Sequence, residues 1–200
     1  MKKTSFSFNL LVAAIAFAGF AFTVSNTVSY SVNTASSTVA WKGYKVTGEH
    51  NGNINLKSGA LTFDNGMLTG GSFEIDMASI KCNDLQGEWA DKLVGHLKSD
   101  DFFGVEKYPT SKFVITKVVS RGTPGSYKVT GNLTIKETTK EIKFDANVSE
   151  EAGNYVATAD IKVDRSEYNV RYGSGSFFDN LGDKTIYDEF DMSVKVVTKK

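Results

Sequence analysis

Apolar and polar residues alternate along most of the chain beyond about residue 30. In the segment SYKVTGNLTIK, Tyr127, Val129, Leu133 and Ile135 point to one face, and lysine, threonine and asparagine side chains point to the other. Successive side chains of a strand point to opposite faces of a sheet, so this period of two predicts a half-buried strand. The same reading predicts further strands at residues 39–46, 53–63, 67–80, 110–119, 140–148, 154–164 and 189–196.

Turn-forming residues separate these strands. The run from Asp64 to Gly66 suits a hairpin, and so does the run from Gly122 to Gly125. About eight antiparallel strands, each with one apolar face, are typical of sandwiches and barrels. Eight strands closed on themselves leave no sheet edge, and their interior is either filled by side chains or holds one small ligand. We therefore expect an all-β fold, an eight-stranded antiparallel barrel.

One amphipathic helix is predicted at about residues 87–98. Trp89, Leu93 and Leu97 recur at intervals of four, which places them on one face of a helix. That stripe must be buried on the sheet or across one mouth of the barrel. Asn83 and Asp84 precede the helix and are its expected N-cap residues.

A long irregular segment, about residues 165–186, reads RSEYNVRYGSGSFFDNLGDKTI. Connections of this length inside a compact domain are often functional or carry structure of their own. The glycines and aromatic residues of this segment predict a folded flap with its own contacts. A short helix is expected within it, at about residues 177–181.

The first 25 residues differ in composition from the rest. Lys2 and Lys3 precede an apolar stretch at residues 10–24, and this order is typical of a secretory signal peptide. We expect cleavage near residues 21–25, with an uncleaved membrane anchor as the alternative. Cys82 is the only cysteine, so an internal disulfide and a lipid-anchored cleavage site are both ruled out. An exported domain without disulfides fits the bacterial periplasm or the cell exterior.

Composition narrows the classes of function. A length of 200 residues suits one domain, and a hydrophobic content of 40% is enough for a sizeable core. The 23 lysines and arginines balance the 23 aspartates and glutamates. This balance removes the electrostatic argument for nucleic-acid binding.

His96, near Asp100 and Asp101, is the strongest candidate for a chemical centre. Zinc needs three or four converging ligands, and His50 is the only other histidine. Adjacent carboxylates of an extended chain point apart, so Asp100 and Asp101 are poorly placed as an acid–base pair. The chain also lacks the spacing of a serine nucleophile elbow or of a calcium-binding loop. We expect no catalytic residue, no metal site and no cofactor.

Several separated motifs carry a family resemblance. The stretch from Gly95 to Phe113 reads GHLKSDDFFGVEKYPTSKF, and later stretches read VTGNLTIKETTKEIKF, VDRSEYNV and YDEFDMSVKV. In this order the motifs resemble the YceI-like family of exported, lipocalin-like barrels. The resemblance covers nearly all of the chain after the predicted signal peptide, and it implies one YceI-like domain at residues 31–198. Gly104 stands where the family usually has Asp, and the flap resembles a longer version, which leaves the head group of a ligand open.

The resemblance implies a barrel that binds an isoprenoid-type amphiphilic lipid in its apolar interior, without enzymatic activity. A carrier or stress-response role and a homodimer are both compatible with it. The inward-facing residues expected to line the lipid site are Phe73, Ile75, Trp89, Leu93, Phe113, Ile115, Leu133 and Phe144. His96, Arg165 and Arg171 are the candidates for contact with a polar head group.

Two alternatives remain open at the level of sequence. One is an enzyme acting on a small amphiphile, with His96, Arg165 and Arg171 as reacting groups. The other is a barrel with a solid core whose function lies on its surface, because periodicity does not distinguish a hollow barrel from a packed one.

Overall fold

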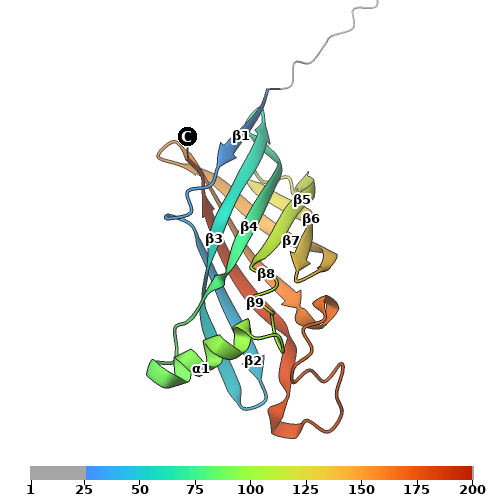
Figure 1. The fold of residues 1–200 in the computed structure, drawn as a ribbon. Coiled ribbons are helices and arrows are strands. Elements are labelled where there is room, and N and C mark those ends of the chain that lie inside the picture. Colours follow the sequence, from blue (N-terminus) through green and yellow to red (C-terminus); the bar gives the residue numbers. More distant parts are fainter. Residues whose placement is uncertain (1–25, 200) are drawn as a thin grey trace, which may run out of the picture.

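The computed structural model describes residues 26–199, so the predicted signal peptide lies outside the described residues. These residues form an elongated barrel with one helix at its lower end (Figure 1). The strands are β1 Thr27–Ser31, β2 Thr38–Lys45, β3 Gly48–Asp64, β4 Met67–Cys82, β5 Thr110–Ser120, β6 Ser126–Ile135, β7 Thr138–Glu151, β8 Asn154–Asp164 and β9 Ile186–Val197. The helix α1 spans Gly87–Lys98, and two 3-10 helices, η1 Arg165–Tyr168 and η2 Gly182–Lys184, lie in the flap.

The barrel closes through eight antiparallel strands. Their order is β3-β2-β9-β8-β7-β6-β5-β4, and β4 pairs with β3 to complete the circle. The predicted eight-stranded antiparallel barrel is therefore confirmed, with each predicted strand present. The short strand β1 was not predicted. It pairs with the second half of β3, from Thr27 opposite Asp64 to Ser31 opposite Ala60.

The upper end of the barrel is closed by aromatic side chains. Phe63 of β3 stacks on Tyr155 of β8 with ring centroids 3.9 Å apart, and Tyr30 of β1 meets both rings edge-on. Such edge-to-face and stacked pairs are favourable beyond the area that they bury. Tyr30 lies on β1, so this short additional strand supplies part of the closure.

The lower end is built differently. There β7 and β8 no longer pair, since their ladder covers only residues 146–151 and 154–159. The 3-10 helix η1 contacts β7 in this region. A second apolar cluster fills the gap, and its buried members are Phe102, Ile135, Val163, Tyr168 and Val170.

Two details of the predicted local structure are wrong. The N-cap of α1 is Gln86, without a side-chain capping bond, because the Asp84 carboxylate instead accepts hydrogen bonds from the Asn51 N–H and from His50. Residues 177–181 do not form a helix, since Asn180 has a φ of 61°, in the left-handed region. Within residues 26–199, no helix is long and apolar enough to cross a membrane.

Candidate ligand cavity

A cavity of about 570 Å³ occupies the interior of the barrel. All eight barrel strands contribute to its wall, and α1 and the flap contribute at the lower end. This volume lies within the range of about 300 to 1,000 Å³ that is usual for small-molecule sites. The barrel is therefore hollow, and the alternative of a barrel with a solid core loses its structural premise.

Seven of the eight residues expected to line a lipid site do lie on the cavity wall. These residues are Phe73, Ile75, Leu93, Phe113, Ile115, Leu133 and Phe144. The aromatic members come from β4, β5 and β7, with the Phe113 ring centroid 6.5 Å from that of Phe73 and 5.5 Å from that of Phe144. Gly131 on β6 makes room for this arrangement, because a Cβ atom there would collide with the Phe113 ring.

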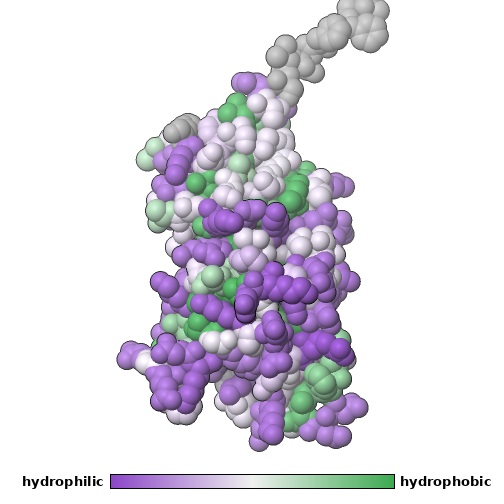
Figure 2. All heavy atoms as spheres, viewed as in Figure 1, coloured by the Kyte–Doolittle hydropathy of each residue, from purple (hydrophilic) through white to green (hydrophobic). Residues whose placement is uncertain are grey.

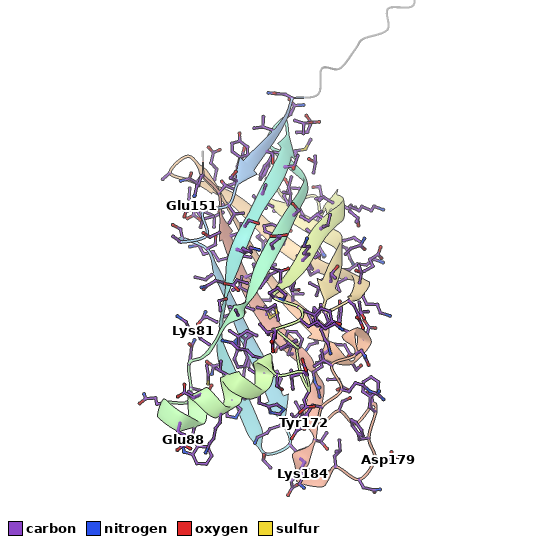
Figure 3. All side chains as sticks on the ribbon, viewed as in Figure 1. Lys81, Glu88, Glu151, Tyr172, Asp179 and Lys184 are labelled. Atoms are coloured by element: carbon purple, nitrogen blue, oxygen red, sulfur yellow. The ribbon has the colours of Figure 1, made fainter. Side chains whose placement is uncertain are left out.

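Trp89 is the exception, and its predicted place on the wall is wrong. Its side chain is 71% exposed. The first turn of α1, marked by Glu88 in Figure 3, projects away from the barrel, and only the later turns reach the cavity. The helical stripe is thus continuous in sequence, but only Leu93 and Leu97 find a partner surface.

The buried polar side chains of the wall, Ser111 and Arg165, already have hydrogen-bond partners. The hydroxyl of buried Ser111 donates to the carbonyl of Thr134 at 2.6 Å. Among the described residues, only Tyr168 Oη and Asp188 Oδ1 are buried side-chain oxygens without a hydrogen bond, and neither residue lines the cavity. An interior of this kind favours hydrocarbon, because a polar ligand atom would find no unpaired partner deep in the barrel.

Arg165 does not serve as a free cation for a head group. Its side chain is 2% exposed, and its guanidinium donates to four backbone carbonyls of the flap and β9, those of Val170, Tyr172, Ile186 and Tyr187. Asp188 Oδ1 lies 3.3 Å from its Nη2 atom. The side chain therefore reaches the cavity wall while its donors hold the flap, which corrects the expectation of a head-group contact.

Arg171 is also displaced from its predicted role. Its guanidinium lies over the ring of Phe177, 4.4 Å from the centroid, and the residue does not line the cavity. The third candidate, His96, does line the cavity near its lower end. Its ring meets Tyr172 of the flap edge to face, with centroids 4.3 Å apart, and also contacts Phe102.

The cavity opens at the lower end, between α1, the β2–β3 hairpin and the flap. Lys45, Tyr172, Asp183, Lys184 and Tyr187 line it there, and Figure 3 shows Tyr172 and Lys184 at this end. We call this opening the mouth. Sequence reasoning missed these residues, although the predicted flap contains three of them.

A polar cluster beside the mouth holds the start of the segment that connects β4 to α1. Asp84 accepts from His50 Nδ1 at 2.8 Å, from the Asn51 N–H at 2.8 Å and from the Cys82 thiol at 3.3 Å. Burial raises the pKa of the Asp84 carboxyl, but these hydrogen bonds outweigh it and lower the pKa to about 2. The cluster therefore ties the end of β4 to β3 through an ionised carboxylate.

Curated relatives share part of this sequence. A UPF0312 protein of Shewanella denitrificans is 32% identical over 96 residues, which is 48% of this chain and 48% of the relative. A UPF0312 protein of Photorhabdus laumondii is 32% identical over 111 residues, 52% of this chain and 53% of the relative. The chain thus spans about half the length of these curated relatives.

Solved structures share the fold. BcnA of Burkholderia cenocepacia superposes with a TM-score of 0.69 at 22% identity, over 84% of this chain and 99% of that protein. A domain from Saccharophagus degradans, described as a polyisoprenoid binding domain implicated in plant cell wall breakdown, gives 0.63 at 12% identity, over 85% and 97%. The Campylobacter jejuni YCEI protein gives 0.53 at 21% identity, over 94% of each chain.

The sequence model of a protein family, the YceI-like domain, matches residues 30–198 of this chain. That range begins in β1 and ends just after β9, so it contains the whole barrel, α1 and the flap. The closed antiparallel barrel with its single helix agrees with this match. The chain belongs to the YceI-like domain family.

Proposed function

We propose that this protein binds the tail of an isoprenoid-type or other long-chain amphiphile inside the barrel. The observation that carries the proposal is the cavity itself, which is apolar in depth, lies below the aromatic rings packed at the upper end of the barrel, and opens at the lower end. Each buried methylene contributes about 0.8 kcal/mol, so a long tail gains affinity from area alone.

The polarity of the wall gives the ligand an orientation. The tail lies in depth, among residues such as Phe73 and Phe113, and the head group lies at the mouth. There it meets charged and aromatic side chains, namely Lys45, His96, Tyr172, Asp183 and Lys184. The structural neighbour from Saccharophagus degradans, described as polyisoprenoid binding, supports the ligand class.

We also propose that the protein is exported and acts as a binding protein or carrier, without a catalytic step of its own. The basic and apolar start of the chain supports export to the periplasm or the exterior. The enzymatic alternative gains no support, because the donors of Arg165 are occupied by backbone carbonyls and Arg171 lies off the cavity.

Mass spectrometry of lipid extracted from gently purified protein tests the proposal. We expect a long-chain lipid in near-stoichiometric amount. A matched pair of variants locates it. Ala159→Phe on β8 adds a ring inside the cavity and should reduce the bound lipid. Val114→Phe, at a position 46% exposed on another strand of the wall, β5, should not. Protein that binds no lipid, natively or with added long-chain amphiphiles, would rule the proposal out.

A further inference from the structure

Exposed aromatic side chains are concentrated at the lower end of the barrel, at the mouth and on the neighbouring first turn of α1. Among residues 26–199, the large aromatic residues with substantially exposed side chains are Trp89, Tyr172, Phe178 and Tyr187, with exposures of 46 to 71%. Trp89 lies on α1, and the other three lie on the flap or at the start of β9. Figure 2 shows hydrophobic surface over the flap at the lower right, among hydrophilic neighbours.

The elements that carry these residues are joined to one another. The Val46 N–H of the β2–β3 hairpin donates to the Thr185 carbonyl of the flap at 3.1 Å, and Val46 is itself 47% exposed. His96 links α1 to the flap through Tyr172. We define the mouth rim as Val46, Trp89, Tyr172, Phe178 and Tyr187.

The rim is continuous with the cavity. Tyr172 and Tyr187 belong both to the exposed rim and to the cavity wall. The opposite end of the barrel differs, since its exposed apolar side chains, Val28, Met67 and Val119, are not aromatic and the aromatic rings there are packed together. Tryptophan and tyrosine prefer the interface between water and the bilayer, where an apolar ring and a polar edge are both accommodated.

The net charge around the mouth indicates whether an anionic or an uncharged membrane surface would attract it. In α1, residues 45–48 and residues 169–188, the cations are Lys45, Lys92, Lys98, Arg171 and Lys184, and the anions are Glu88, Asp91, Asp179, Asp183 and Asp188. The two sets balance. A balanced surface gains no net attraction from an anionic membrane, so any attachment must come from the apolar and aromatic side chains.

We infer that the mouth rim docks on the surface of a phospholipid bilayer, and that it does so without requiring anionic lipid. Docked in this way, the cavity opens directly toward the acyl region, and a tail passes between bilayer and barrel without crossing water. The inference deepens the proposed function and rests on it for the identity of the transferred molecule, a long-chain amphiphile. Attachment to the bilayer is a separate property of the protein.

Vesicle flotation tests the inference. The protein is used as its host processes it, with the N-terminus checked by mass spectrometry, and is mixed with phosphatidylcholine vesicles. The variant Val46→Ser/Trp89→Ser/Phe178→Ser removes three rim residues that do not line the cavity. The control Met67→Ser/Val114→Ser/Val119→Ser removes three exposed apolar side chains elsewhere. All proteins compared share one N-terminus, so that segment cannot produce a difference between them.

We expect wild type and control to float equally, at low and at high salt alike. The partition coefficient of the rim variant onto the vesicles should be lower by a factor of about ten or more. Equal flotation of the rim variant, or flotation that requires phosphatidylserine or low salt, would overturn the inference. So would a rim that instead mediates dimerisation in solution, seen by sedimentation. Lipid extraction separates the two claims, because a protein that carries lipid and ignores vesicles refutes only the docking.

Discussion

His96 of α1 and Tyr172 of the flap meet at the mouth of the cavity, with their rings nearly perpendicular at 87° and their centroids 4.3 Å apart. This contact joins two elements that are far apart in the sequence and that form opposite sides of the mouth. A tail that enters or leaves the barrel passes beside it. The contact is therefore a natural determinant of how fast a ligand exchanges.

Truncation of Tyr172 should speed ligand release. In Tyr172→Ala, the flap loses its ring contact with α1, and we expect a several-fold higher dissociation rate for a fluorescent long-chain amphiphile, measured by stopped flow. An aromatic pair of this kind is worth about 0.5 to 1.5 kcal/mol. Phe178→Ala, on the same flap but off the cavity wall, is the control and should leave the rate unchanged. Equal rates in all three proteins would show that this contact does not control exchange.

Replacement of Arg165 should destabilise the fold rather than weaken a head-group contact. In Arg165→Lys, one ammonium cannot replace the guanidinium donors that reach four carbonyls, so buried acceptors lose their partners. We expect a loss of about 3 kcal/mol in urea unfolding. Arg171→Lys, at an exposed position, should change stability by less than about 0.5 kcal/mol. If Arg165→Lys kept full stability but bound lipid poorly, a head-group role would return.

The Asp84 carboxylate should make part of the free energy of unfolding depend on pH in the acid range. Its pKa is lowered from 3.8 to about 2 in the folded protein, so its contribution is complete above about pH 4 and is lost as the pH falls toward 2. We expect Asp84→Asn to be less stable than wild type by about 1 kcal/mol at neutral pH, because solvent weakens the interactions of this exposed residue. Urea titrations at several pH values should show this difference shrinking toward pH 2.

Asp101→Asn, at an exposed position, provides the matched comparison for Asp84. It should follow the wild-type stability at each pH, because Asp101 does not belong to the cluster of His50, Asn51 and Cys82. A constant gap between Asp84→Asn and wild type from neutral pH down to pH 2 would mean that charge is not the source of the contribution.

Removal of the Tyr168 hydroxyl should cost nothing. The residue is 1% exposed, its oxygen has no hydrogen-bond partner, and burial raises its pKa to about 12. Tyr168→Phe should therefore be as stable as wild type or more stable by about 1 kcal/mol. It should also lack the loss of stability expected in wild type as the pH rises from 10 toward 12.

Tyr127→Phe is the informative contrast to Tyr168→Phe in thermal unfolding. The Tyr127 hydroxyl accepts from the Leu68 N–H at 3.4 Å, so its removal leaves a buried donor without that partner and should destabilise the barrel. A clear loss of stability in Tyr168→Phe would indicate that its hydroxyl binds a buried water.

The period of two was sufficient to predict the barrel strands, because each strand has one face exposed to solvent and one face buried in the barrel. It could not reveal β1, which has five residues and only Tyr30 partly buried. Nor could it give the cavity, since side chains that face inward leave or fill a space according to their packing. The seven residues found on the wall were identifiable by face, while the volume between them was not.

The exposure of Trp89 and the backbone contacts of Arg165 were missed for one reason, which is that both depend on where the folded chain brings distant residues together. A helical stripe tells which side of α1 is apolar but not where the helix runs past the edge of the barrel, so Trp89 was placed inside. Likewise, an arginine in a loop is visible in sequence as a cation, but the four carbonyls that converge on Arg165 come from residues up to 22 positions away. Such convergence is a property of the folded chain alone.

The rings of Tyr30, Phe63 and Tyr155 make the barrel a tube with one blind end. A blind tube acts as a ruler for whatever enters it. Each added methylene strengthens binding only until the tail reaches the closed end of the cavity, and any further length must stay outside or fold back. In a homologous series of amphiphiles, affinity should therefore climb with chain length and then level off, and the chain length at that break measures the depth of the tube.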